Sequence, residues 1–171
     1  MTEPLQPSAD DGEAGRERRA SPRIESAPEF IQLLQSRERG KLKVYIGSAA
    51  GTGKSYRMLQ EAHDLRKRGI DLVVGFVETH KRAETEAQVR DLEIVPRKRI
   101  EYRGVTLEEM DVDAIIARKP DVAVVDELAH TNVPGSRNTK RWQDVELLRD
   151  EGISVISAVN LQHLESLNNV I

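Results

Sequence analysis

The chain has 171 residues, of which 38% are hydrophobic and 32% are charged, and its formal net charge is -3. This length predicts one domain with a sizeable core, and the charge balance excludes binding to nucleic acid through bulk electrostatics. Because the chain has no cysteine, no run of about 18 apolar residues and no secretory signal, disulfides, thiolate sites and membrane spans are excluded and we expect a cytoplasmic protein.

The first part of the chain is predicted to lack a core. Residues 1–28 hold four of the seven prolines and few apolar side chains, so we expect a disordered tail there. Residues 29–40 are predicted to form a short helix and linker, with an apolar stripe of Phe30, Leu33 and Leu34. We expect this helix to pack on the domain that follows it; docking to a partner is the alternative.

Strands and helices alternate from residue 41 onward. The apolar runs predict strands at 41–46, 71–77, 100–102, 121–125 and 153–158. The helical periodicity predicts helices at 54–68, 79–90, 106–118 and 139–150, and from residue 160 onward. Within that set, Thr106–Glu109 is interpreted as a capping box that opens a helix. The alternation predicts an α/β fold over residues 41–171, a three-layer sandwich with a mostly parallel central sheet.

The first predicted strand is followed by a glycine-rich segment, Gly47-Ser48-Ala49-Ala50-Gly51-Thr52-Gly53-Lys54-Ser55. Small residues let the main chain wrap around phosphates with its N–H groups pointing inward. Lys54 is expected to reach the β- and γ-phosphates of a nucleotide, and the Ser55 hydroxyl to ligate Mg²⁺. The segment departs from the usual Walker A spacing, because Ser48 stands at the first glycine position. It nevertheless predicts a P-loop and a P-loop NTPase-like fold; an ordinary glycine-rich turn is the alternative.

A second motif fits the first. The apolar run Val122–Val125 ends in Asp126 and Glu127. Asp126 is expected to assist the Mg²⁺, directly or through water, and Glu127 is a candidate catalytic residue that orients a water for attack on the γ-phosphate. The alternatives are a solvated strand end for Asp126 and a binding site without turnover for Glu127.

Other polar residues follow predicted strands. Arg137, in a loop with turn chemistry, is a candidate catalytic residue that reaches a γ-phosphate in its own or a neighbouring subunit. Asn160 is a candidate polar sensor of the nucleotide, and Glu78–His80 is a candidate sensor or helix cap. A plain surface arginine is the alternative for Arg137. The four histidines have no metal-ligand spacing, so a zinc site is not expected.

Several long motifs extend beyond these residues. They are the glycine-rich segment itself, Gly75–His80, Val125–Asn132, Pro134–Arg137, Lys140–Val145 and Val159–Asn168. Over residues 39–171 they make the chain similar to the N-terminal cytoplasmic domain of the KdpD family, the osmosensitive potassium-responsive sensor histidine kinases of bacteria. A small residue at position 48, with glycine one step earlier, is that family's own form of the loop.

The resemblance implies an ATP-binding input domain that modulates a two-component kinase and phosphatase controlling a potassium transporter. Its partners would be the remaining domains of the sensor kinase or the cognate response regulator. In the family this domain continues further and is followed by a universal-stress-like domain, membrane helices and the kinase core. We therefore expect the chain to be truncated at its C-terminus, with the sheet lacking its last strand, and not to act as a histidine kinase alone.

Three functions follow as hypotheses. The leading one is a regulatory module that binds ATP and Mg²⁺. The second is a stand-alone ATPase or small-molecule phosphotransferase, and the third is an interaction module that needs no nucleotide. The residues do not choose between ATP and GTP, and they leave the sensed signal and the oligomeric state open.

Overall fold

The computed structural model describes residues 27–35, 39–48 and 53–166. Residues 1–26 of the predicted tail, residues 49–52 of the glycine-rich segment (Ala49, Ala50, Gly51 and Thr52) and residues 167–171 lie outside the described residues. The elements are, in order, α1 (Ala27–Gln35), β1 (Leu42–Gly47), α2 (Lys54–Lys67), β2 (Leu72–Phe76), α3 (Ala83–Arg90), β3 (Lys98–Tyr102), β4 (Val105–Glu109), α4 (Val112–Arg118), β5 (Val122–Val125), α5 (Arg141–Asp150), β6 (Ser154–Asn160) and the 3-10 helix η1 (Leu161–Ser166).

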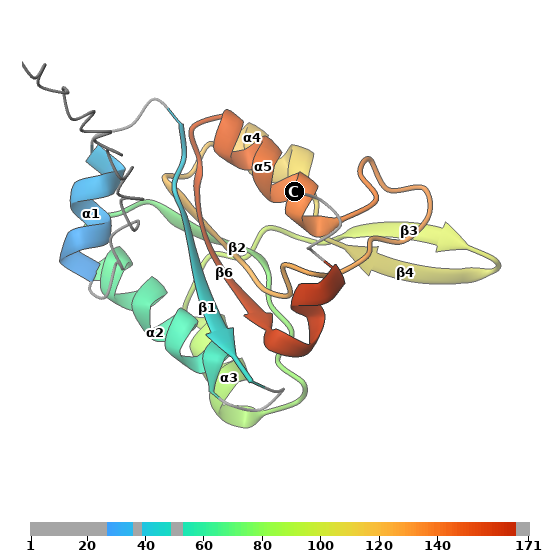
Figure 1. Ribbon diagram of the computed structural model, residues 1–171, viewed down its shortest axis with the longest axis horizontal. Coiled ribbons are helices and arrows are strands. Elements are labelled where there is room, and N and C mark those ends of the chain that lie inside the picture. Colours follow the sequence, from blue (N-terminus) through green and yellow to red (C-terminus); the bar gives the residue numbers. More distant parts are fainter. Residues whose placement is uncertain (1–26, 36–38, 49–52, 167–171) are drawn as a thin grey trace, which may run out of the picture.

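The central sheet has four parallel strands in the order β1-β6-β5-β2 (Figure 1). Its strands are apolar runs, and β2 and β5 are buried along their whole length, as expected for strands covered on both faces. In the register of the first pair, Gly47 lies beside Asn160. The predicted α/β fold with a mostly parallel sheet is therefore confirmed, and all four strands end at the same edge.

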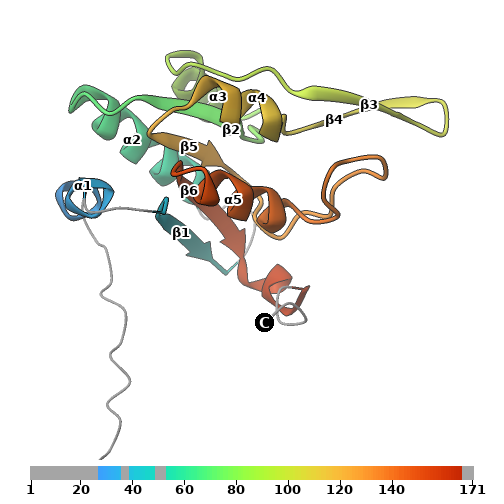
Figure 2. The ribbon, with the colours of Figure 1, turned by 90° about the horizontal axis from the view of Figure 1, so that it is seen from above.

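Helices cover both faces of this sheet (Figures 1 and 2). Side chains of α1 and α2 pack on one face in a cluster that includes Phe30, Met58 and Leu59. Side chains of α4 and α5 pack on the other face in a cluster that includes Ile115 and Leu148. The result is a three-layer arrangement, and the predicted packing of the first helix on the domain is confirmed.

The predicted helix at 106–109 is wrong, because Val105–Glu109 is strand β4, paired antiparallel with β3. The connecting residues Arg103 and Gly104 have φ values of 49° and 76°, and two positive φ values in succession are what a tight hairpin turn requires. The capping-box pattern is outweighed by this turn and by the cross-strand pairs. The helix begins later, at Val112, where the Asp111 carboxylate accepts a hydrogen bond of 3.0 Å from the Ala114 N–H.

Other elements also differ in their bounds or type, and α1 begins at Ala27, inside the stretch 1–28 that is predicted to be a disordered tail. Helix α3 begins at Ala83 rather than at residue 79, and the Thr79 hydroxyl instead donates to Glu86 at 3.4 Å. Strand β6 extends to Asn160 and is followed by the 3-10 helix η1. Among the residues that the structure describes, no helix has both the length and the apolar character needed to cross a membrane.

Helix α1 gives a direct test of the core. Phe30 has no exposed surface, so Phe30→Ala would leave a cavity against α2 and is expected to lower the free energy of unfolding by roughly 3–5 kcal/mol. Urea denaturation followed by circular dichroism measures this change. Gln32→Ala, on the exposed side of the same helix, is the matched control and should change stability by less than about 0.5 kcal/mol. Equal effects of the two substitutions would show that α1 is not part of the folded core.

Candidate functional site

The predicted site residues meet at the carboxyl edge of the sheet. The Ser55 hydroxyl donates to Asp126 Oδ2 at 3.0 Å, although the two residues are far apart in sequence. The Lys54 ammonium group donates to Asn160 Oδ1, at the end of β6. Side chains from the start of α2 and from the ends of β5 and β6 are thus brought together, as expected where parallel strands share an edge.

Helix α2 begins directly at this edge. Gly53 precedes it as the N-cap residue in a left-handed conformation with φ of 77°, and as a glycine it offers no capping side chain. The first turn also carries no acidic residue. The helix is 14 residues long, so the partial positive charge of its N-terminus is available to an anion at this point.

A pocket of about 590 Å³ opens over the same edge. This volume lies within the range of small-molecule and cofactor sites. One part of its wall is formed by Gly53, Lys54, Ser55 and Asn160, and its acidic part by Asp126 and Glu127. The lining also includes the basic or imidazole side chains His80, Arg82, His130, Lys140 and His163. A pocket with several cations and two adjacent carboxylates has the composition expected for an anionic ligand that carries a metal ion.

Asp126 has the character of a metal-binding carboxylate. It is only 5% exposed, and this burial raises its pKa, an effect that hydrogen bonds from the Glu127 N–H at 2.8 Å and from Ser55 partly offset. A buried carboxylate and a hydroxyl are hard oxygen donors of the kind Mg²⁺ prefers, so the donor set fits this ion. In the described ranges no group of three or more histidine or carboxylate side chains is arranged so that it could hold a metal ion by itself.

Glu127 has an unusual backbone and two basic neighbours. Its φ is 55°, in the left-handed region, and its side chain is 39% exposed. Its carboxylate oxygens lie 3.9 Å from His80 Nε2 and 3.9 Å from Arg141 Nη1. At this separation the Arg141 guanidinium attracts the Glu127 carboxylate without a short hydrogen bond, and the carboxylate stays accessible from the pocket.

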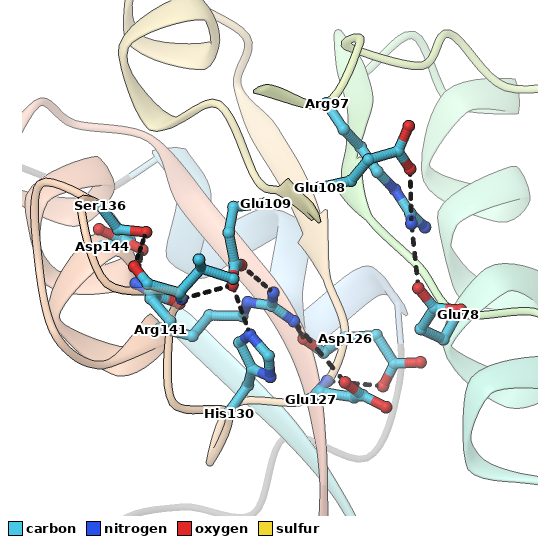
Figure 3. A network of polar contacts seen from close by, with 12 residues as sticks. Glu78, Arg97, Glu108, Glu109, Asp126, Glu127, His130, Ser136, Arg141 and Asp144 are labelled. Atoms are coloured by element: carbon cyan, nitrogen blue, oxygen red, sulfur yellow. Dashed lines mark hydrogen bonds and ion pairs between the residues drawn. The ribbon is translucent and has the colours of Figure 1, made fainter. Parts of the chain in front are cut away.

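Behind Glu127 lies a buried network that sequence reasoning missed (Figure 3). Arg141 has no exposed surface; it donates to Glu109 Oε2 at 3.0 Å and to the main-chain oxygen of Asp126 at 3.3 Å. Its guanidinium also lies over the Phe76 ring, 3.7 Å from the ring centroid. The end of β5, the end of β4 and the first turn of α5 are thereby fixed to one another.

Glu109 accepts three hydrogen bonds in this network. Besides Arg141, the His130 ring nitrogen lies 2.8 Å and the Val133 N–H lies 2.8 Å from Glu109 Oε1. Burial alone would raise the pKa of Glu109, but the hydrogen bonds from His130 and Val133 and the nearby charges outweigh it and hold the pKa below its ordinary value. The carboxylate is therefore ionised and paired.

No sequence signal identified this pair. The capping-box pattern predicts a helix at Glu109, which lies instead at the end of strand β4, and the motif that contains Arg141 predicts no role for this residue. Recognising Arg103-Gly104 as a hairpin turn would have placed Glu109 beside the sheet edge. The burial of Arg141 depends on tertiary packing, which a single sequence does not display.

The remaining predicted residues are placed as follows. Gly47 ends β1 and Ser48 follows it, while Ala49–Thr52 lie outside the described residues. Arg137 pairs with Asp113 in the first turn of α4 and does not line the pocket. Glu78 accepts a hydrogen bond from Arg97 at 3.0 Å. The catalytic role of Arg137 stays a prediction.

The burial of Asp126 gives a prediction about stability and pH. Because the folded state disfavours the ionised form, Asp126→Asn is expected to stabilise the metal-free protein by about 0.5–2 kcal/mol at neutral pH. The asparagine keeps both contacts, accepting from Glu127 N–H and donating to Ser55. Because the pKa of Asp126 is raised in the folded state, the free energy of unfolding of the wild type falls as pH rises above the range where an exposed aspartate titrates. The difference in the free energy of unfolding between Asp126→Asn and the wild type therefore grows with pH. Thermal melts between pH 3 and 8 measure it, and an advantage that shrinks with rising pH would contradict the argument.

Comparison with known proteins agrees with this arrangement. The family model described as "KdpD: Osmosensitive K+ channel His kinase sensor domain" matches residues 38–171. Sensor protein KdpD of Escherichia coli (strain K12) is 55% identical over 142 residues, which are 83% of this chain and 16% of that protein. The Sensor protein KdpD of Mycobacterium tuberculosis (strain ATCC 25618 / H37Rv) is 53% identical over 134 residues, or 78% of this chain and 16% of the relative. That of Clostridium acetobutylicum is 48% identical over 137 residues, or 80% of this chain and 15% of the relative.

The chain thus spans only 15% to 16% of the length of these curated relatives. The matched region includes β1, the start of α2, β5 and β6, so it contains every described residue of the site. The family model covers well over half of the chain. This chain therefore belongs to the KdpD family of osmosensitive K+ channel His kinase sensor domains.

Proposed function

We propose that this chain is an ATP- and Mg²⁺-binding regulatory input domain of a KdpD-type two-component sensor kinase. The observation that carries the proposal is the 3.0 Å contact between the Ser55 hydroxyl and the Asp126 carboxylate beneath the pocket. These are the two side chains that a P-loop site uses for its magnesium ion, and they come from elements that only the fold brings together.

In this proposal each residue has a defined task. The glycine-rich segment, Gly47–Ser55, surrounds the triphosphate, with Lys54 on the β- and γ-phosphates. Ser55 and Asp126 hold the Mg²⁺, which neutralises phosphate charge when bound, and Asn160 contacts the terminal phosphate once Lys54 turns toward the nucleotide. The cations on the opposite wall, such as Lys140 and Arg82, add favourable potential for a polyanion.

The regulatory part of the proposal rests on the relatives. Their names describe sensor proteins, and this chain matches a small share of their length. A domain that binds a nucleotide and folds as its own unit can change its conformational equilibrium on binding. Other domains of the sensor kinase, or a response regulator, would then detect that change. The potassium or osmotic signal and a cytoplasmic location belong to the same proposal.

Nucleotide binding has a thermal signature. A ligand that binds only the folded state, at about 100 times its dissociation constant, stabilises a protein by about 2.7 kcal/mol. Melts of the wild-type chain with and without ATP and Mg²⁺ are therefore expected to separate by several degrees. Lys54→Ala is expected to remove this separation because it deletes the phosphate-binding ammonium group.

Lys67→Ala is the matched control, since this lysine is exposed in the last turn of the same helix. It is expected to leave the nucleotide-dependent shift unchanged. Superimposable wild-type melts with and without nucleotide, at millimolar ATP and Mg²⁺, would refute the proposed function.

A second candidate function is hydrolysis of ATP or transfer of its phosphate to a small molecule. The position of Glu127 favours it, because this carboxylate lines the pocket directly after Asp126 and lies between His80 and Arg141. A carboxylate there can accept a proton from an attacking hydroxyl or water. Arg137 would serve as a charge-stabilising residue only if its loop moved or if it came from a neighbouring subunit.

Turnover separates the two candidates. If Glu127 orients the nucleophile, Glu127→Gln is expected to slow phosphate release by about 100-fold or more while leaving the ATP-dependent melting shift in place. A coupled colorimetric phosphate assay on the purified chain measures the rate. If phosphate is released at the same rate with the wild type as in buffer without protein, hydrolysis is excluded and only the regulatory binding function remains.

A further inference from the structure

The β3–β4 hairpin projects away from the central sheet, and its base is fastened to the carboxyl edge by two arginines (Figures 1 and 3). Arg97 donates to Glu78 at 3.0 Å and lies 3.6 Å from Glu108. Arg141 contacts Glu109 at 3.0 Å and the main chain of Asp126 at 3.3 Å. Glu108 and Glu109, the last two residues of β4, are thus each paired with an arginine that also contacts a residue at the carboxyl edge of the central sheet.

Arg141 faces two carboxylates that differ in their surroundings. Glu127, 3.9 Å away, lines the pocket, whereas Glu109, 3.0 Å away, is buried at the base of the hairpin. Because the guanidinium is fully buried, solvent screens these interactions poorly. Glu109 contacts Nη2 and Glu127 lies near Nη1 of the same guanidinium, so a movement of Arg141 toward Glu127 changes its contact with Glu109.

His130 provides a second link between the pocket and Glu109. It lines the pocket, and its Nε2 lies 2.8 Å from Glu109. Both side chains that hold the Glu109 carboxylate are thus one contact away from the pocket contents. An anion placed in the pocket competes with Glu109 for the hydrogen bond of His130, and it repels Glu127 toward Arg141.

We propose that the β3–β4 hairpin is the element through which occupancy of the pocket is transmitted, with Arg141 as the coupling residue. A nucleotide in the pocket competes with Glu109 for His130 and, by repelling Glu127 toward Arg141, draws Arg141 away from Glu109, so that the base of the hairpin loosens. This inference rests on the proposed nucleotide-binding function and names the part of the domain that responds to it.

The hairpin is suited to respond because it has little other support. It is a separate two-stranded sheet, and such a ribbon is only marginally stable in water without further packing. Val105 is 56% exposed and Leu107 is 37% exposed, so β4 buries little apolar surface of its own. The polar contacts of Glu109 therefore form a large share of what holds β4 in place.

Hydrogen exchange measured by mass spectrometry on the intact chain tests the inference. Addition of ATP and Mg²⁺ is expected to speed exchange of amides in residues 105–109 by about threefold or more, the effect of weakening one or two hydrogen bonds. In Arg141→Lys the charge remains, but one ammonium group cannot bridge Glu109 and the edge of the sheet, so the response is expected to disappear. Arg118→Lys is the matched control, because that arginine pairs with Asp71 and Glu93 away from the pocket, and its response should equal that of the wild type.

Glu109→Gln provides a second variant that removes the competing charge and is also expected to abolish the nucleotide response in residues 105–109. Melts with ATP and Mg²⁺ on the same samples separate the two proposals. A wild-type melting shift with unchanged or slower exchange at 105–109 overturns the hairpin inference alone, as does a full response in Arg141→Lys. Absence of the melting shift in the wild type overturns the proposed function, and this inference with it.

Discussion

The buried guanidinium of Arg141 is the interaction on which the arrangement of the site depends. A charge without exposed surface is costly unless its partners are close, and here Glu109, the Asp126 carbonyl and the Phe76 ring supply them. Removing either member of such a pair leaves an uncompensated buried charge, at a cost of about 3–5 kcal/mol. These contacts fix the hairpin, the end of β5 and the start of α5 relative to one another. Glu127, which follows β5, then lines the pocket.

The parallel sheet explains why the motif residues meet. The strand order places β6 between β1 and β5, so the end of β1 and Asp126 are two strand spacings apart, about 10 Å. The start of α2 lies over this edge, where Ser55 contacts Asp126 and Lys54 contacts Asn160. The basic side chains on the other side of the pocket lie at the same edge of the sheet.

The sequence predicted those parts of the site that follow from local pattern. Apolar runs identified the sheet strands, and because parallel strands end at one edge, the meeting of Ser55 with Asp126 could be expected. The hairpin could not be predicted with the same rules, since Thr106–Glu109 also satisfies a helix-capping pattern and the choice depends on the turn at Arg103-Gly104. The Glu109–Arg141 pair then required the correct hairpin and the packing of α5, which are properties of the tertiary structure. Arg137 illustrates the opposite case, because a suggestive loop position did not bring its side chain to the pocket.

The strand that leads into the glycine-rich segment occupies the border of the sheet. Among the described residues, β1 has a hydrogen-bonded neighbour on one side only, and it is less buried than β2 or β5. Local unfolding of a border strand costs less free energy than that of an interior strand, because fewer backbone hydrogen bonds must break. The end of β1 at Gly47 thus lies on a border strand, whereas Asp126 and Asn160 lie at the ends of the interior strands β5 and β6. These two pocket residues are consequently held on the stiffer, interior part of the sheet.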